Sequence, residues 1–184
     1  TKPETARRVK QRVKVILDWA KAKGKRTGPN PTEGLAEVLP KKERAPAKHH
    51  PALPYRDVAT FLTELRTARA SKSARLAFEF LILTATRTNE VLQMTWSEVD
   101  LPAKTWTVPA ERMKMGVEHK VPLARRAVKV LEEARELADG GEFVFPGRPK
   151  APLSNMVFLM LLRRLERGDI TAHGFRSSFR DWAA

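Results

Sequence analysis

The last fourteen residues of the chain, TAHGFRSSFRDWAA, place one histidine and two arginines at helical spacing. His173 and Arg176 are three residues apart, and Arg180 follows one turn later. Side chains three and four residues apart lie on the same face of a helix. We therefore expect these three side chains to converge on one negatively charged ligand, for which a phosphate group is the best candidate.

Two further basic residues stand in distinctive stretches. Arg87 lies in TATRTNEVLQMTW, directly after a strongly apolar segment, and Lys114 lies in ERMKMG, between two expected strands. Each has an ordinary structural explanation when it is taken alone. Arg87 could pair with Glu90 at i and i+3 of a helix, and Lys114 could be a solvated lysine in a hairpin turn.

The charge balance favours a nucleic-acid partner. The 184 residues contain 35 Lys and Arg against 21 Asp and Glu, a net charge of +14, and the pI is about 10.5. The excess is uneven, because residues 1–50 carry a net +9 and residues 51–184 a net +5. A solubilising surface is the plain alternative. A membrane surface fits less well, since no strongly amphipathic helix with bulky apolar anchors accompanies the charge.

Composition also excludes several classes of protein. The chain contains no cysteine, which rules out disulfides, thiolate metal sites and cysteine nucleophiles. No apolar run approaches the roughly 18 residues of a membrane span, and the first stretch, TKPETARRVKQ, lacks the apolar core of a secretory signal. We therefore predict an intracellular protein without a membrane segment.

The N-terminal third divides into a helix and a linker. Residues 1–23 are predicted to form a basic amphipathic helix that ends near Gly24. A single helix cannot bury its apolar stripe alone, so we interpret it as the last helix of a further domain. Residues 24–54 are rich in Pro, Gly and Lys with little periodicity, which predicts a basic linker.

From Tyr55 onward the pattern predicts a mainly α domain with a small antiparallel β-sheet, an α+β fold. The sheet is expected at residues 98–123, where short β-rich pieces alternate with turns. A cap at Ser154 and a cap at Thr171 are expected to begin the last two helices. The expected helices span residues 56–67, 73–86, 89–96, 124–138, 154–168 and 171–184.

These motifs, in this order, resemble the tyrosine recombinases, specifically the prophage and genomic-island integrases. The stretch TRTNEVLQMTW, which contains Arg87, is similar to that around the first catalytic arginine of the family. Lys114 in PAERMKM corresponds to the hairpin lysine, and His173 and Arg176 in TAHGFR match the H-x-x-R motif. The resemblance runs over residues 55–184, and residues 1–23 resemble the last helix of the family's core-binding domain.

The resemblance implies an activity and its partners. It implies the catalytic-domain fold of these enzymes and site-specific integration of a mobile element, through DNA strand cleavage, a 3′-phosphotyrosyl intermediate and rejoining. The implied partner is double-stranded DNA at attachment sites, bound by a homo-oligomer, and the implied location is the cytoplasm at the bacterial nucleoid. No cofactor is implied.

The chemistry of a phosphodiester under attack explains the residue types. The non-bridging oxygens gain negative charge, and a planar guanidinium can donate to two of them at once, which suits Arg87 and Arg176. By resemblance, Lys114 protonates the leaving 5′ oxygen, and His173 contacts the phosphate and accepts or relays the tyrosine proton. Glu90 is interpreted as a support for a nearby backbone group or arginine.

We predict no metal site. Metal-dependent phosphoryl transfer requires clustered carboxylates, and those of this chain are scattered through the expected helices. His49 and His50 are adjacent but lack two further ligands, so they are interpreted as linker residues. His119, in VEHKVPL, is interpreted as a strand residue near the end of the sheet, with DNA contact as the alternative.

The chain departs from the family at the nucleophile. The family's tyrosine follows H-x-x-R, whereas the one tyrosine here is Tyr55, which we interpret as a packing residue. Trp182 lies six residues after Arg176 and is predicted to be in the core. We therefore expect a fragment, truncated before the nucleophile, that binds DNA without cleaving it. A non-catalytic DNA-binding remnant of an integrase is the alternative, and an RNA-binding protein is disfavoured because the expected sheet lacks aromatic clusters.

DNA contacts are expected outside the catalytic cluster as well. The candidates are Arg7, Lys10 and Lys14 on the first helix, with Lys41 and Lys42 in the linker. Such cations contact mainly the phosphate backbone, so they predict binding that depends strongly on salt and weakly on sequence.

Overall fold

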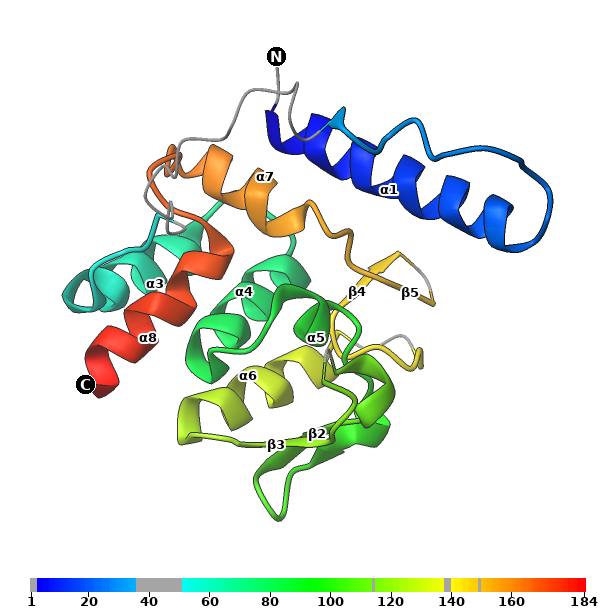
Figure 1. Cartoon of the computed structure of the whole chain (residues 1–184). Helices are drawn as coiled ribbons and strands as arrows, with labels where there is room; N and C mark the ends of the chain where they lie inside the picture. Colours follow the sequence, from blue (N-terminus) through cyan, green and yellow to red (C-terminus); the bar gives the residue numbers. More distant parts are fainter. Residues whose placement is uncertain (1–2, 36–50, 114, 138–139, 149) are drawn as a thin grey trace. The chain divides into compact units, whose positions relative to one another are not determined.

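The computed structural model describes residues 3–35, 51–113, 115–137, 140–148 and 150–184, in two compact units, Thr1–His49 and His50–Ala184 (Figure 1). Several residues singled out in the sequence lie outside the described residues; they are Lys41, Lys42, His49, His50 and Lys114.

The first unit contains the predicted basic helix, α1 (Pro3–Ala22). The residues after it, 24–35, were assigned to the linker, but they fold back onto the helix. The side-chain amide of Asn30 donates to the carbonyl of Lys14 at 3.1 Å and to the carboxylate of Asp18 at 2.6 Å. Asn30 is buried, so a turn that sequence composition marked as linker is packed by its own hydrogen bonds.

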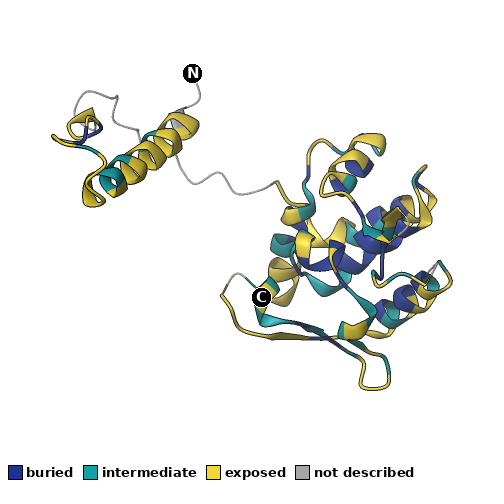
Figure 2. Cartoon of the chain, turned by 90° about the vertical axis from the view of Figure 1, so that its right-hand side faces the viewer, coloured by how far each residue is buried: buried dark blue, intermediate teal, exposed yellow. Residues whose placement is uncertain are grey.

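The second unit is mainly helical with a small antiparallel sheet, as predicted, and Figure 2 shows its buried residues gathered between the helices. Its α-helices are α3 (Val58–Thr67), α4 (Lys72–Thr84), α5 (Thr88–Leu92), α6 (Arg125–Arg135), α7 (Val157–Arg164) and α8 (Phe175–Ala183). Its strands are β1 (Val99–Asp100), β2 (Thr105–Val108), β3 (His119–Pro122), β4 (Pro146–Arg148) and β5 (Ala151–Pro152). Short 3₁₀ turns are η1 (Tyr55–Asp57), η2 (Trp96–Glu98), η3 (Ala110–Arg112) and η4 (Ala172–Gly174).

The helix α4 is the centre of this unit. Its sequence, KSARLAFEFLILT, is apolar on almost every side, so it is stable only where other elements cover it. It packs against α3, α5, α6, α7 and α8. Ser71 caps its start by accepting from the N–H of Ala74 at 3.2 Å, and Ala85 ends it in the left-handed conformation, at φ 49°.

The predicted sheet has the strand order β1-β2-β3, with Trp106 opposite Val121 and Val108 opposite His119. Trp106, Val108 and Val121 are buried against the core. The hairpin β4-β5, which pairs Arg148 with Ala151, was not predicted. It is short and contains prolines, which remove backbone donors from a strand and suppress the usual sequence signal.

Residues 51–54, also assigned to the linker, pack against the last two elements of the second unit. The carbonyl of Pro51 accepts from the backbone N–H of Thr171 at 3.1 Å, and the carbonyl of Leu53 accepts from the hydroxyl of Ser178. Leu53 is buried in the core. The second unit therefore includes residues that precede the expected boundary at Tyr55.

Candidate active site

Three separate parts of the second unit line one surface pocket, with a volume of about 630 Å³. They are the turn from α4 into α5, the two sides of the β2-β3 hairpin, and η4 with α8. We call it the Arg87 pocket. Its lining residues are Thr84, Ala85, Thr86, Arg87, Glu90, Met113, His119, His173, Arg176, Ser177, Phe179 and Arg180.

Arg87 stands at the start of α5 and is held by Glu90. The carboxylate of Glu90 accepts from the backbone N–H of Arg87 at 2.9 Å and from its guanidinium at 2.6 Å. The Glu90 side chain is 5% exposed, whereas that of Arg87 is 41% exposed. The ion pair considered as the plain explanation therefore exists, yet it leaves the guanidinium open to the pocket. Glu90 supports both the backbone and the side chain of Arg87, as predicted.

Arg176 is joined to the same turn. Its guanidinium donates to the carbonyl of Ala85, two residues before Arg87. A guanidinium has five donor hydrogens, so one bond to the backbone leaves others for a ligand. This link brings an arginine of α8 beside an arginine of the α4-α5 turn, although the two are far apart in the sequence.

His173 lies in η4, which precedes α8. The predicted cap is present, because the hydroxyl of Thr171 accepts from the N–H of Gly174 at 3.0 Å. Gly174 itself is a residue that sequence reasoning missed. A Cβ at this position would overlap the carbonyl oxygen of Pro51 and lie 2.9 Å from the Cα of Ala52. The glycine of HGFR thus permits the close approach that places His173 at the pocket.

The hairpin side of the pocket is formed by Met113 and His119. Lys114 follows Met113 directly and lies outside the described residues. His119 is the first residue of β3, in agreement with the prediction of a strand residue near the end of the sheet. Of the four predicted catalytic residues, the structure brings Arg87, His173 and Arg176 together.

Positive charge is in excess in the pocket. Its lining includes Arg87, Arg176 and Arg180, and a single carboxylate, that of Glu90. Arg180 also pairs with the exposed carboxylate of Asp181 at 3.0 Å. An open pocket with more guanidinium groups than carboxylates is suited to bind an anion.

In the part of the chain that the structure describes, no three His, Asp or Glu side chains form a group able to hold a metal ion. In the same residues, no helix is long and apolar enough to span a membrane.

Comparison with known proteins identifies the family. Residues 52–182 match the model of the phage integrase family. The chain belongs to this family. It is 35% identical to prophage integrase IntA of Escherichia coli (strain K12) over 178 residues. These aligned residues cover 95% of this chain and 42% of the relative. It is 36% identical over 181 residues to prophage integrase IntZ of the same organism, with 97% and 44% covered. The chain therefore spans less than half the length of these curated relatives.

Solved integrases share the fold of this phage integrase family chain. The Tn1549 transposon integrase, in complex with a circular intermediate DNA, superposes with a TM-score of 0.70 at 15% identity, over 96% of this chain and 65% of that protein. A lambda integrase dimer bound to a COC′ core site superposes with a TM-score of 0.62 at 20% identity, over 92% and 63%. The mainly helical fold with its small sheet is the one seen in these enzymes.

The predicted DNA contacts of α1 differ in their surroundings. Arg7 is exposed and Lys10 is partly buried. The ammonium of Lys14 donates to the carboxylate of Asp18 at 2.6 Å. This hydrogen bond raises the pKa of Lys14 and, together with one from Asn30, lowers the pKa of Asp18. Lys14 therefore has a carboxylate partner within α1.

Several aromatic residues of the second unit are exposed, among them Tyr55, Phe179 and Trp182. Trp182 was predicted to be in the core, and this is wrong, because it is 65% exposed. Its ring is tilted by 45° against that of Phe179, with the ring centroids 5.6 Å apart, and Phe179, three residues earlier on α8, is also exposed. Tyr55 is 40% exposed and lines an apolar groove of about 380 Å³ with these two residues. It is not among the residues that line the Arg87 pocket.

Proposed function

We propose that the second unit is part of the catalytic domain of a site-specific DNA recombinase, which integrates a mobile element by cleaving and rejoining DNA strands. The observation that supports this most strongly is the convergence of Arg87, His173 and Arg176 on one pocket with an excess of positive charge. The pocket is larger than a phosphate ion requires, so it has room for a phosphodiester with part of its flanking sugars.

The arginines would stabilise the transition state. A tyrosine oxygen attacks phosphorus, a new P–O bond forms, and the bond from phosphorus to the 5′ oxygen breaks. Arg87 and Arg176 donate to the non-bridging oxygens, where negative charge increases. Arg87 is oriented by Glu90, and Arg176 by the carbonyl of Ala85, so both donors are in place before the charge develops.

Proton transfer accompanies this exchange. In the proposal, His173 accepts the proton of the attacking tyrosine and Lys114 gives a proton to the leaving 5′ oxygen. Rejoining is the reverse reaction, in which a 5′ hydroxyl attacks the phosphotyrosyl bond. The backbone bond energy is conserved, so no cofactor is required.

The attacking tyrosine would come from outside these 184 residues. The one tyrosine present, Tyr55, lines the apolar groove instead of the Arg87 pocket. Lambda integrase has been seen as a dimer and as a tetramer on DNA. We propose that this protein also assembles as a homo-oligomer on double-stranded attachment sites, in the cytoplasm at the nucleoid, and that the chain as given binds DNA without cleaving it.

The backbone contacts of the first unit belong to the same proposal. Arg7, Lys10 and Lys14, with Lys41 and Lys42, would neutralise DNA phosphates without reading bases. Arg7 is the strongest of the described candidates because it is exposed, whereas Lys14 is already paired with Asp18.

A DNA strand-cleavage assay distinguishes an active recombinase from a non-catalytic DNA-binding remnant. In the protein expressed from its complete coding sequence, Arg87→Ala or Arg176→Ala should lower strand cleavage about 10²- to 10³-fold, because each removes a transition-state donor. Lys114→Ala should slow cleavage and leave DNA affinity almost unchanged. Trapping the covalent protein–DNA complex on a nicked duplex measures the first effect, and fluorescence anisotropy of the same duplex measures the second.

The matched control is Arg163→Ala, on the exposed surface of α7 and outside the pocket. It should cleave like the unchanged protein. Full cleavage by either arginine variant of the pocket would refute the assigned role, and binding without any cleavage by the unchanged protein would favour the remnant.

A further inference from the structure

We propose that His119 is an additional DNA-binding residue of the Arg87 pocket, whose imidazole donates a hydrogen bond to an oxygen of the phosphate bound there. This inference rests on the proposed function, since it assigns a further ligand to the same site. The described catalytic candidates, Arg87, His173 and Arg176, lie outside the strands, so His119 also adds a donor from the sheet.

The register of the sheet determines where His119 points. Residues directly opposite each other in an antiparallel pair, and residues two apart along a strand, have their side chains on the same face. His119 is opposite Val108 and two residues before Val121. Both valines are buried against the core. His119 therefore points to the core side of the sheet.

His119 is exposed although it is on the core side, because it stands at the first position of β3, where the Arg87 pocket opens beside the core. Its neighbour Lys120 lies on the other face, is exposed, and is 3.8 Å from the carboxylate of Glu118. Lys120 does not line the pocket. The adjacent cation of the strand is thus directed to solvent, and the histidine is directed to the site.

The three described donor elements then act from different directions. Arg87 comes from the α4-α5 turn, His173 and Arg176 come from η4 and α8, and His119 comes from the sheet. An imidazole N–H is a donor in the neutral and in the charged form, so the contact does not require protonation.

Phosphate titration of the chain itself tests the assignment. The sequence contains four histidines, so the imidazole ¹H–¹⁵N signals can be resolved and assigned with His119→Gln and His173→Gln. Inorganic phosphate is added at constant pH. The signals of His119 and His173 should shift along one binding curve, whereas those of His49 and His50 serve as references. His119→Gln should weaken phosphate binding about 3- to 10-fold, the worth of one hydrogen bond.

The matched control is Lys120→Gln, which removes a cation from the other face of the same strand. It should change phosphate affinity less than about 2-fold, the effect of an exposed charge. If the His173 signal shifts and that of His119 does not, or if both variants weaken binding equally, the role of His119 is refuted and the proposed function stands. If neither signal shifts, the pocket does not bind phosphate and the proposed function fails with it. The signals of the unchanged chain decide this even if a variant folds poorly.

Discussion

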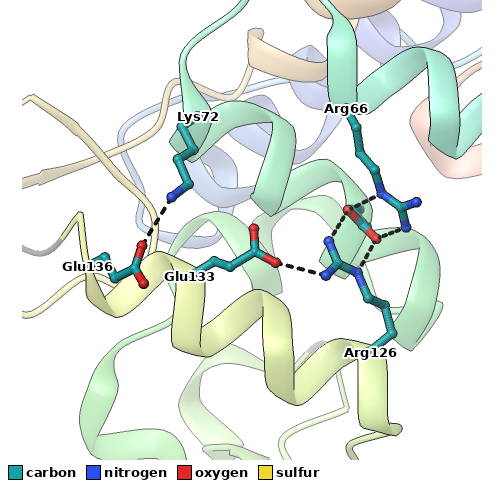
Figure 3. Close-up of polar contacts among 6 residues, drawn as sticks. Arg66, Lys72, Arg126, Glu133 and Glu136 are labelled. Carbon is teal, nitrogen blue, oxygen red and sulfur yellow. Dashed lines mark hydrogen bonds and ion pairs between the residues drawn. The ribbon is translucent and has the colours of Figure 1, made fainter.

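The second unit contains two arginine–carboxylate clusters, one that lines the candidate anion site and one that joins helices. The first is the Arg87 pocket. The second, which we call the Glu79 cluster, joins three helices through Arg66 on α3, Glu79 on α4, and Arg126 and Glu133 on α6. Glu79 is 1% exposed and accepts from Arg66 at 2.5 Å and from Arg126 at 2.7 and 3.0 Å. In Figure 3 the guanidinium of Arg126 lies between Arg66 and Glu133. Arg126 also donates to the carboxylate of Glu133 at 2.8 Å.

The clusters differ in charge balance. The Glu79 cluster has two arginines and two carboxylates, and its central carboxylate is inaccessible to solvent. Burial alone would raise the pKa of Glu79, but hydrogen bonds from Arg126 and Arg66 outweigh it, and the pKa is lowered. In the Arg87 pocket three arginines line the surface together with one carboxylate. Exposure does not separate the clusters, since the side chain of Arg66 is 47% exposed and that of Arg87 is 41% exposed. The comparison indicates that an arginine–carboxylate pair is structural where its charges are balanced, and available for an anion where positive charge is in excess.

Removing the central charge of the Glu79 cluster should have the largest effect. Glu79→Gln leaves two arginines beside a neutral amide in a buried position, so the free energy of unfolding should fall by about 3 kcal/mol. Urea denaturation followed by circular dichroism measures this. Phosphate binding at the Arg87 pocket should persist where the variant is folded.

The control for this substitution is Glu136→Gln, which breaks the neighbouring ion pair with Lys72 (Figure 3). Both side chains are largely exposed, so stability should change by less than about 0.5 kcal/mol. Equal effects of the two substitutions would show that the Glu79 cluster is no more structural than a surface pair.

The pH dependence of stability should follow from the lowered pKa of Glu79. A carboxyl group whose folded pKa lies below its unfolded value, about 4.3, stabilises fully above that value and loses this contribution as pH falls through the folded pKa. The gap in unfolding free energy between the unchanged protein and Glu79→Gln should therefore narrow below about pH 4. Urea denaturation at a series of pH values measures the gap. A constant gap down to pH 3 would contradict the assignment.

On the side of the pocket, Gly174→Ala should have an intermediate effect. The added Cβ would overlap the backbone of residues 51–52, so the segment must move, at a cost of about 2 kcal/mol. Because His173 adjoins Gly174, phosphate affinity should fall as well. Gly168→Ala is the control, since a Cβ there meets open space. A shift of Tm and affinity in the first variant alone would support the close approach.

The smallest effect is expected at Ala85. Its left-handed φ of 49° costs an alanine about 1–2 kcal/mol, and glycine avoids most of this while losing about 0.5–1 kcal/mol of backbone entropy. Ala85→Gly should therefore raise Tm by a few degrees at most. Lys104 has a φ of 51° in the β1-β2 turn, so Lys104→Gly should raise Tm by a similar amount. Calorimetry measures the Tm of both variants. A clear loss of stability in Ala85→Gly alone would show that the backbone of Ala85 is not strained.

Local patterns predicted much of this molecule. The apolar sequence of α4 identified a buried helix, Thr171 identified a cap, and the short β-rich piece around Trp106, with turns on either side, identified a strand, because each signal depends on residues close together in the chain. The exposure of Trp182 and the hairpin β4-β5 were missed. Whether a face of α8 is covered depends on elements far away in the sequence, and very short strands carry too few residues for a pattern.

The site shows the same division. The sequence by itself determined that this chain is basic, that it belongs with the integrases, and which cations are candidates, because residue types and their spacing carry this information directly. Only the tertiary structure decided that the carbonyl of Ala85 accepts a hydrogen bond from Arg176 and that Gly174 allows the backbone at Pro51 to approach closely. It also decided that His119 lines the pocket and that Glu79 is bound by two arginines. Those contacts join residues distant in the chain, and their energies depend on burial and charge balance, which exist only once the helices have packed.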